Sequence, residues 1–213
     1  MKFIKQTFRT IFQYIIRFIA YLLFMPKTVY QDKAAIKKSD EPVIFLCNHR
    51  SFYDGALVAV AVHKKQQNTV STIPRVLIAK DWYEKRILHQ PLMWFGGIPI
   101  NRFKPDTSWV TKAKAVLENG QSVLIFPEGK TSQGEMNPFH PGFALLAQRT
   151  GARIVPCAIC SRYRWFDWHT KVIVGTPYPL PNPPGMKHTA SARLAAEDAQ
   201  QRVKKLYESG GKL

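Results

Sequence analysis

Short apolar runs, each bounded by polar or turn-forming residues, recur along the chain from about residue 40 onward. Such runs are typical of buried strands, and they predict strands at residues 43–46, 74–79, 98–100, 123–126, 152–160 and 171–175. Apolar residues at helical spacing predict helices at residues 53–63, 82–94, 107–119, 139–148 and 191–208. Strands that alternate with helices predict an α/β fold with a twisted, mixed, mostly parallel sheet flanked by helices.

Residues 2–25 follow a different pattern. At helical spacing, one face carries polar residues, namely Lys2, Gln6, Arg9, Gln13 and Arg17, and the opposite face carries Ile4, Phe8, Ile11, Ile15, Phe18 and Leu22. A membrane span needs about 20 mostly apolar residues, and an Arg near its middle costs roughly 2.5 to 3.5 kcal/mol. The pattern therefore predicts an amphipathic helix that lies in the interface of an anionic membrane. A single short span is the alternative.

No cleavage site of small residues follows this segment, which argues against an ordinary secretory signal. Residues 27–40 are polar and basic and predict a connector over the surface. The remaining length suits one domain with a sizeable core. We therefore expect a membrane-associating helix at residues 1–26 and a single folded domain at residues 27–213.

Charge narrows the class of partner. The chain has 31 basic and 14 acidic residues, a formal net charge of +17, which favours an anionic substrate, membrane surface or nucleic acid. The segment Arg162-Tyr163-Arg164-Trp165 would suit nucleic acid, but that function leaves residues 2–25 without a use. Three cysteines, Cys47, Cys157 and Cys160, lie in or beside predicted buried strands and indicate core residues in a reducing compartment. The Cys157-x-x-Cys160 spacing is a weak sign of redox or metal chemistry.

The strand at residues 43–46 ends in Cys47-Asn48-His49-Arg50-Ser51-Phe52-Tyr53-Asp54-Gly55. Four residues separate His49 from Asp54, so the chain can turn back and bring the carboxylate to the imidazole. A neutral imidazole is a base near pH 7, and a carboxylate on its other nitrogen fixes the tautomer and stabilises the imidazolium. Alternatively, His49 is a surface residue of the loop and Asp54 is a helix residue favoured by the dipole.

Three later segments favour the chemical interpretation of this block: Gly96-Gly97-Ile98-Pro99-Ile100-Asn101-Arg102, Val123-Leu124-Ile125-Phe126-Pro127-Glu128-Gly129, and Ala152-Arg153-Ile154-Val155-Pro156. In this order and spacing, residues 40–160 resemble the glycerolipid acyltransferases, a family that includes the 1-acylglycerol-3-phosphate acyltransferases. The combination of N-H-x-S-x-x-D with F-P-E-G is specific, whereas either block alone is weak. Ala79-Lys80 and the segment from Pro91 to Gly96 match two further blocks of the family.

The resemblance implies a role for each block. His49 would be the general base and Asp54 the residue that orients it. Arg102 would hold the phosphate of the acceptor, because a guanidinium matches phosphate oxygens in two places. Lys80 would meet an anion at the end of its strand. The resemblance implies that Glu128 and Gly129 shape the acceptor pocket, with backbone N–H groups near Gly129 available to an anion. Lys130, which follows them, is a further candidate to bind the substrate.

The family usually continues F-P-E-G with T-R-S, whereas this chain has Lys130-Thr131-Ser132. The resemblance implies an O-acyltransferase that forms phosphatidate from 1-acyl-sn-glycerol 3-phosphate and acyl-CoA or acyl carrier protein, on the cytoplasmic face of a membrane. No cofactor, metal or nucleic acid is expected. The Lys130-Thr131 departure leaves a second acceptor open, such as lyso-ornithine lipid or another lysophospholipid.

Overall fold

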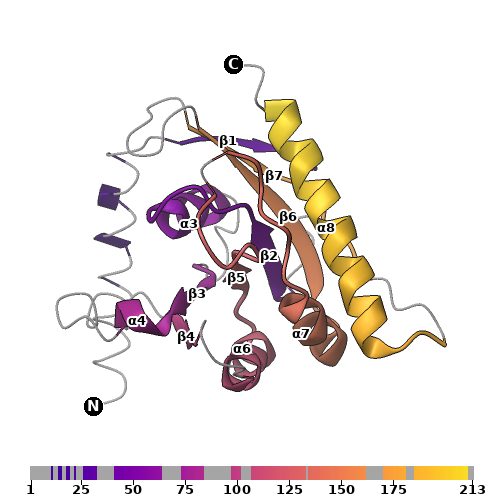
Figure 1. Cartoon of the computed structure of the whole chain (residues 1–213). Helices are drawn as coiled ribbons and strands as arrows, with labels where there is room; N and C mark the ends of the chain where they lie inside the picture. The colour runs from indigo at the N-terminus through magenta and orange to yellow at the C-terminus, as the bar shows by residue number, and fades with distance from the viewer. Residues whose placement is uncertain are drawn as a thin grey trace, which may run out of the picture.

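The computed structural model describes residues 11, 14, 15, 18, 19, 22, 26–32, 41–63, 73–83, 97–101, 107–132, 134–161, 170–180 and 185–210. Seven strands form one sheet: β1 (Lys27–Tyr30), β2 (Val43–Cys47), β3 (Arg75–Ala79), β4 (Ile98–Ile100), β5 (Val123–Ile125), β6 (Arg153–Cys160) and β7 (Lys171–Val174). The helices are α3 (Asp54–His63), α4 (Lys80–Tyr83), α6 (Ser108–Glu118), α7 (Gly142–Thr150) and α8 (His188–Gly210) (Figure 1).

The strands lie in the order β1-β7-β6-β2-β5-β3-β4. From β6 to β4 all neighbours are parallel, whereas β7 runs antiparallel to β6 and β1 runs parallel to β7. The predicted mixed, mostly parallel sheet with flanking helices is therefore confirmed. Because β2, β3, β4, β5 and β6 share one direction, their carboxyl ends meet at one edge of the sheet, where sites of open α/β folds gather.

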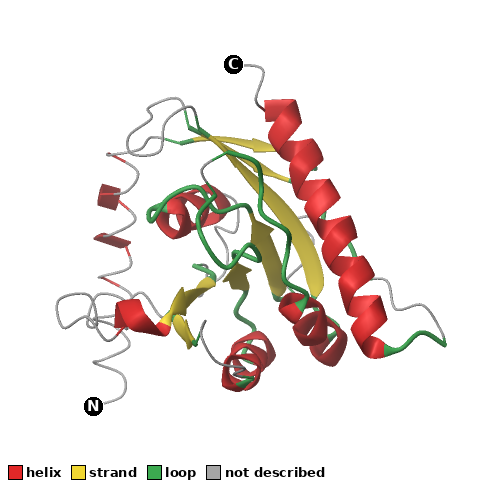
Figure 2. Ribbon diagram, in the orientation of Figure 1, coloured by secondary structure: helices red, strands yellow, loops and turns green. Residues whose placement is uncertain are grey.

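Helices cover both faces of the sheet (Figure 2). In β2, all five residues are buried, and their side chains alternate between the two faces. Ile44 and Leu46 join the cluster that includes α6, α7 and α8, while Val43, Phe45 and Cys47 join the cluster that includes α3. This three-layer packing explains why the central strands are continuous apolar runs: both of their faces are removed from water.

The helices α6 and α7 end close to the glycines that follow them, as the sequence predicted. After α6, Gly120 has φ 74°, and after α7, Gly151 has φ 68°, which is the left-handed conformation that glycine adopts most readily. Thr107 is the residue before α6 but makes no capping bond through its side chain. The last helix, α8, is longer than predicted at both ends, and α7 begins at Gly142, after Pro141.

The prediction that residues 27–40 form only a connector is wrong for the first part of this range. Lys27–Tyr30 is the edge strand β1, which pairs with β7. Its side chains are alternately exposed and half-buried, so the strand has no apolar run. A short edge strand that carries charged residues does not require an apolar run, because it has a neighbouring strand on one side only and its other side faces solvent. Of the predicted helical region 82–94, the structure describes only the end of α4, and residues 84–94 lie outside the described residues.

Six residues of the N-terminal segment are described, and all six are helical and exposed: Ile11, Tyr14, Ile15, Phe18, Ile19 and Leu22. They recur at intervals of three and four, so they lie on one face of the helix. We refer to them as the apolar stripe. The predicted polar-face residues, together with Ile4 and Phe8, lie outside the described residues. Among the helices of the described residues, none combines the length and apolar content needed to cross a bilayer.

Candidate active site

The candidate site lies at the carboxyl edge of the parallel strands. His49 follows β2, Lys80 follows β3 as the first residue of α4, and Glu128 follows β5. Arg102, two residues after β4, lies outside the described residues. The sheet order places β5 between β2 and β3, so the turns after these strands are neighbours although they are far apart in the sequence.

His49 and Asp54 are in direct contact, as the spacing predicted. The imidazole Nδ1 lies 2.8 Å from Asp54 Oδ2, and the side chains of His49 and Asp54 are 22% and 1% exposed. Asp54 is the first residue of α3, so the turn at residues 48–53 brings the helix start back to the end of β2. Within the described part of the chain, Nε2 of the imidazole makes no hydrogen bond. This second nitrogen is therefore the one that can exchange a proton with a bound molecule.

The Asp54 carboxylate has several donors besides the imidazole. Its Oδ2 accepts the backbone N–H of Arg50 at 2.5 Å and of Ser51 at 2.8 Å, and its Oδ1 accepts the Ser51 hydroxyl at 2.7 Å. These bonds compensate a buried carboxylate for its lost hydration. They also fix the position of Oδ2, and with Nδ1–H donating to that oxygen the neutral imidazole keeps Nε2 as an acceptor.

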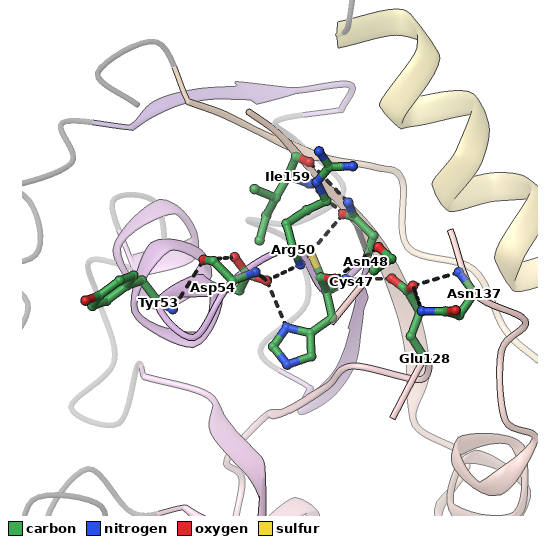
Figure 3. Close-up of polar contacts among 11 residues, drawn as sticks. Cys47, Asn48, Arg50, Tyr53, Asp54, Glu128, Asn137 and Ile159 are labelled. Carbon is green, nitrogen blue, oxygen red and sulfur yellow. Dashed lines mark hydrogen bonds and ion pairs between the residues drawn. The ribbon is translucent and has the colours of Figure 1, made fainter. Parts of the chain in front are cut away.

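The F-P-E-G turn also contacts His49. Phe126 stacks on the imidazole with 4.4 Å between ring centroids and 21° between the planes. Glu128 is 2% exposed, and its Oε1 accepts the backbone N–H of His49 at 2.6 Å. Its Oε2 accepts the backbone N–H of Asn137 at 2.7 Å and the side-chain N–H of Asn137 at 3.1 Å. Figure 3 shows Asp54 and Glu128 on opposite sides of the segment that carries Asn48.

Two more polar side chains fix the same segment. Asn48 is buried and bonds the backbone of Ile159 twice, donating to its carbonyl at 3.1 Å and accepting its N–H at 2.7 Å. Ser132 donates both its backbone N–H, at 2.8 Å, and its hydroxyl, at 3.1 Å, to the His49 carbonyl. No role was predicted for Asn48, Ser51, Ser132 or Asn137. The first three at least lie inside the two motif blocks, whereas no pattern marks Asn137.

Four of the residues predicted to bind the acceptor, namely Lys80, Glu128, Gly129 and Lys130, follow strands at the same edge of the sheet. Lys80 and Lys130 are exposed. Gly129 has φ 68°, and its N–H donates to the Phe126 carbonyl, so this particular donor is already used. A Cβ on Gly129 would lie 3.2 Å from Cδ2 of His140, so the close approach of that ring also favours glycine. Among the predicted site residues, the described bonds join Asp54 to the His49 side chain and Glu128 to the His49 backbone.

The thiol nearest the site is not suited to act as a nucleophile. Cys47 is fully buried, and burial raises the pKa of its thiol well above the ordinary value, with further contributions from Cys157 and Asp54. Its Sγ donates to Asn48 Oδ1 at 3.6 Å. Because the thiolate is the reactive form of cysteine, this thiol is inert near neutral pH. The group able to take up a proton in the described site is the imidazole.

Several known proteins are similar to this chain in sequence. A family model described as acyltransferase matches residues 27–160. A chloroplastic 1-acyl-sn-glycerol-3-phosphate acyltransferase of Brassica napus is 26% identical over 139 residues, which cover 62% of this chain and 37% of that protein. The enzyme of the same name from Cocos nucifera is 29% identical over 146 residues, covering 67% of this chain and 44% of that protein.

The corresponding enzyme of Streptococcus pneumoniae is 27% identical over 128 residues, covering 60% of this chain and 45% of that protein. The matched segments thus span less than half the length of these relatives. The crystal structure of the 1-acyl-sn-glycerophosphate acyltransferase of Thermotoga maritima is 17% identical, with a TM-score of 0.61, and the superposition covers 97% of this chain and 98% of that one. This last likeness concerns the fold.

Proposed function

Because the chain belongs to the acyltransferase family, we propose that it is an O-acyltransferase that acylates 1-acyl-sn-glycerol 3-phosphate to give phosphatidate. The observation that carries the proposal is the 2.8 Å contact between His49 Nδ1 and the buried Asp54 carboxylate. This contact equips a partly exposed imidazole to act as a base, and three relatives with this activity in their names match between 60% and 67% of the chain.

In the proposed reaction, Nε2 of His49 takes the proton of the acceptor hydroxyl as its oxygen attacks the thioester carbonyl. Asp54 holds the imidazole in the required tautomer and stabilises the imidazolium that forms. When the tetrahedral intermediate collapses, the carbon–sulfur bond breaks and the imidazolium returns the proton to the leaving thiolate. The ester is formed, the thiol is released, and the step uses no covalent enzyme intermediate and no metal. The donor is acyl-CoA or acyl carrier protein.

The acceptor carries a phosphate, for which the chain offers cations at the edge of the sheet. We assign Arg102 to this phosphate because a guanidinium bonds two phosphate oxygens at once. Lys80 and Lys130 are exposed cations that follow β3 and β5, and they would add to the attraction for an anion. An Arg102→Ala variant should raise KM for a phosphate-bearing acceptor much more than KM for the thioester. Equal effects on both substrates would remove Arg102 from the phosphate site.

The Lys130-Thr131 pair supports a second candidate acceptor. The family usually has Thr-Arg at these two positions, so the cation here lies one residue earlier. Lyso-ornithine lipid or another lysophospholipid would then replace lysophosphatidate. Exchanging Lys130-Thr131 for Thr-Arg should change the order of preference among acceptors if the pair contacts the headgroup. An unchanged order would show that it does not.

The acceptor is a membrane lipid, and we propose that the apolar stripe keeps the site at the cytoplasmic surface of the membrane. The six side chains are between 44% and 62% exposed, and they face one way. Their burial in the interface would provide most of the binding free energy, with basic residues adding about 1 kcal/mol each on an anionic leaflet. If alkaline carbonate does not extract the protein and residue 1 lies across the membrane, the helix spans instead.

An assay of the purified full-length protein in lipid micelles tests the function directly. The acceptors are lysophosphatidate, lysophosphatidylethanolamine, lysophosphatidylglycerol and lyso-ornithine lipid, each offered with acyl-CoA and with acyl carrier protein. We expect phosphatidate to be the main product, and the same protein with His49→Ala to be inactive. Preference for another lysolipid would select the second candidate, and no transfer to any of them would refute the proposal.

A further inference from the structure

Residues 128–132, which are distant in the sequence, bond both the backbone N–H and the backbone carbonyl of His49. Its N–H donates to Glu128 Oε1 at 2.6 Å. Its carbonyl accepts the N–H of Ser132 at 2.8 Å and the hydroxyl of Ser132 at 3.1 Å. The position of the imidazole therefore depends on the turn after β5 as well as on Asp54. Phe126, at the start of the same turn, stacks on the imidazole ring.

The environment of Glu128 does not suit contact with a lipid phosphate. The residue is 2% exposed, and both carboxylate oxygens are occupied, Oε1 by His49 and Oε2 by Asn137. The three donors leave little room for a fourth partner. A carboxylate would in addition repel the phosphate of the acceptor, since like charges in a site of low dielectric constant interact strongly. Two of the three bonds, at 2.6 and 2.7 Å, have the short lengths of bonds to a charged acceptor.

We propose that Glu128 and Ser132 are positioning residues for the His49 base, and that Glu128 acts on the backbone of His49 instead of on the acceptor. The inference rests on the proposed function, because it explains how the base of that reaction is held. A displacement of about 1 Å in a reacting group can lower a rate about a hundredfold. Two bonds to the carbonyl of His49 and one to its N–H restrict such displacements. Asp54 then sets the rotation and the tautomer of a ring whose backbone is already fixed.

Four variants of the full-length protein distinguish a Glu128 that positions His49 from a Glu128 that contacts the acceptor. Glu128→Gln keeps the volume but turns one side of the group into a donor, which then faces an N–H of His49 or of Asn137. Glu128→Ala removes both contacts. Ser132→Ala removes the hydroxyl bond to His49 but leaves the N–H bond. Asn137→Ala is the matched control, since it removes one bond to Glu128 without touching His49.

We expect Glu128→Gln and Glu128→Ala to lower kcat at least tenfold, with acceptor KM changed less than twofold. Ser132→Ala should lower kcat about threefold, and Asn137→Ala should lower it less than that. Each variant is compared with wild type by circular dichroism and thermal melting. If Glu128 instead contacts the acceptor, its variants will raise acceptor KM at nearly constant kcat, and this result would overturn the proposal. If the Glu128 variants do not fold, an unchanged kcat in Ser132→Ala would overturn it.

A second measurement does not require activity. In protein labelled with ¹⁵N-histidine in micelles, the His49 signals are assigned by their loss in His49→Ala. We expect Glu128→Gln to shift the backbone amide and ring nitrogen signals of His49, and the Asn137→Ala control to shift them much less. His49 signals unchanged by Glu128→Gln would overturn the proposal. Should wild type acylate none of the lysolipids, the proposed function fails, and these spectra still decide whether Glu128 holds His49.

Discussion

Two regions of this protein depart from the usual distribution of polar and apolar groups, in opposite directions. At the turn after β2, the polar side chains of Asn48, Asp54 and Glu128 are buried. In the N-terminal helix, the apolar side chains of Ile15, Phe18 and Leu22 are at least half exposed. In the first region, every buried polar group named here has a partner within the chain. In the second, the apolar side chains face outward.

The difference separates two tasks. Buried polar groups with complete hydrogen bonding are rigid and hold one arrangement, which is what a proton-transfer site requires. Exposed apolar groups on one helix face gain free energy only when something outside the chain covers them, which is what attachment to a lipid surface requires. Changes in the first region should therefore affect the chemical step, and changes in the second should affect where the protein is found.

The strongest test of this separation is His49→Ala. The variant should lose acyl transfer by roughly 10² to 10⁴ in kcat, the range typical of general-base catalysis. Its binding to anionic vesicles should not change. An exposed histidine on α8, His188, provides the matched control, since His188→Ala should keep full activity. Activity of His49→Ala above about a hundredth of wild type would mean that His49 is not the base.

Replacing Asp54 should have the next largest effect. Asp54→Asn puts a neutral amide beside Nδ1, which allows the tautomer with the proton on Nε2, so we expect kcat to fall about a hundredfold. The pH dependence of the rate should change as well, because the imidazolium loses its carboxylate. Ser51→Ala removes the hydroxyl bond to Asp54 Oδ1 and the longer bond that the hydroxyl accepts from the Tyr53 N–H, and it is the matched control, with an expected loss of a few-fold. An unchanged rate and pH profile in Asp54→Asn would exclude Asp54 from the site.

The thiols beneath the site test whether this region is closed to solvent. Burial raises the pKa of Cys160 to about 11, with Lys171 and Arg50 opposing the shift, and burial also raises the pKa of Cys157. A thiol reacts as its thiolate, so near pH 8 we expect the native protein to be alkylated by iodoacetamide tens of times more slowly than the protein in urea. Rapid alkylation of the native protein would show that the region opens.

The smallest expected effect concerns the apolar stripe. The double variant Phe18→Ser, Leu22→Ser should bind anionic vesicles about tenfold more weakly, because it removes part of the apolar area that the helix would bury in the interface. Turnover of a short-chain, water-soluble acceptor should stay at the wild-type level. Leu194→Ser on α8 is the matched control, since Leu194 is 50% exposed but lies far from the stripe in the sequence. Equal losses of vesicle binding in both proteins would deny the stripe a special role.

The central part of the fold was predictable because its strands are buried on both faces. Residues of β2, β5 and β6 form apolar runs for that reason, and runs of this kind are the strongest signal of a strand in a sequence. The edge strand β1 gives no such signal, because hydrogen bonds to β7 hold it while its side chains stay partly in water. The sequence therefore predicted the strands from β7 to β4 and missed the edge strand β1.

The candidate site likewise has one part that the sequence predicted and another that it did not. The contact between His49 and Asp54 is local, so the spacing of the two residues was enough to predict it. The contact between Glu128 and His49 joins residues 79 positions apart, and it exists because β2 and β5 are neighbours in the sheet. Asn137 completes the bonds of Glu128 from a segment without a recognisable pattern. Such contacts require the order of the strands, which the pattern of apolar residues does not specify.

The pairing of β1 with β7 has a consequence for the time course of folding. Lys27 pairs with Lys171, so β1, the first described strand, completes its hydrogen bonds only when β7, the last described strand, is present. Pairings of such long range are slow to form, because a large loop must close before they contribute any stability. During synthesis from the amino end, the stripe emerges long before the sheet can close. The N-terminal helix is therefore able to meet a lipid surface while most of residues 27–213 are still being made.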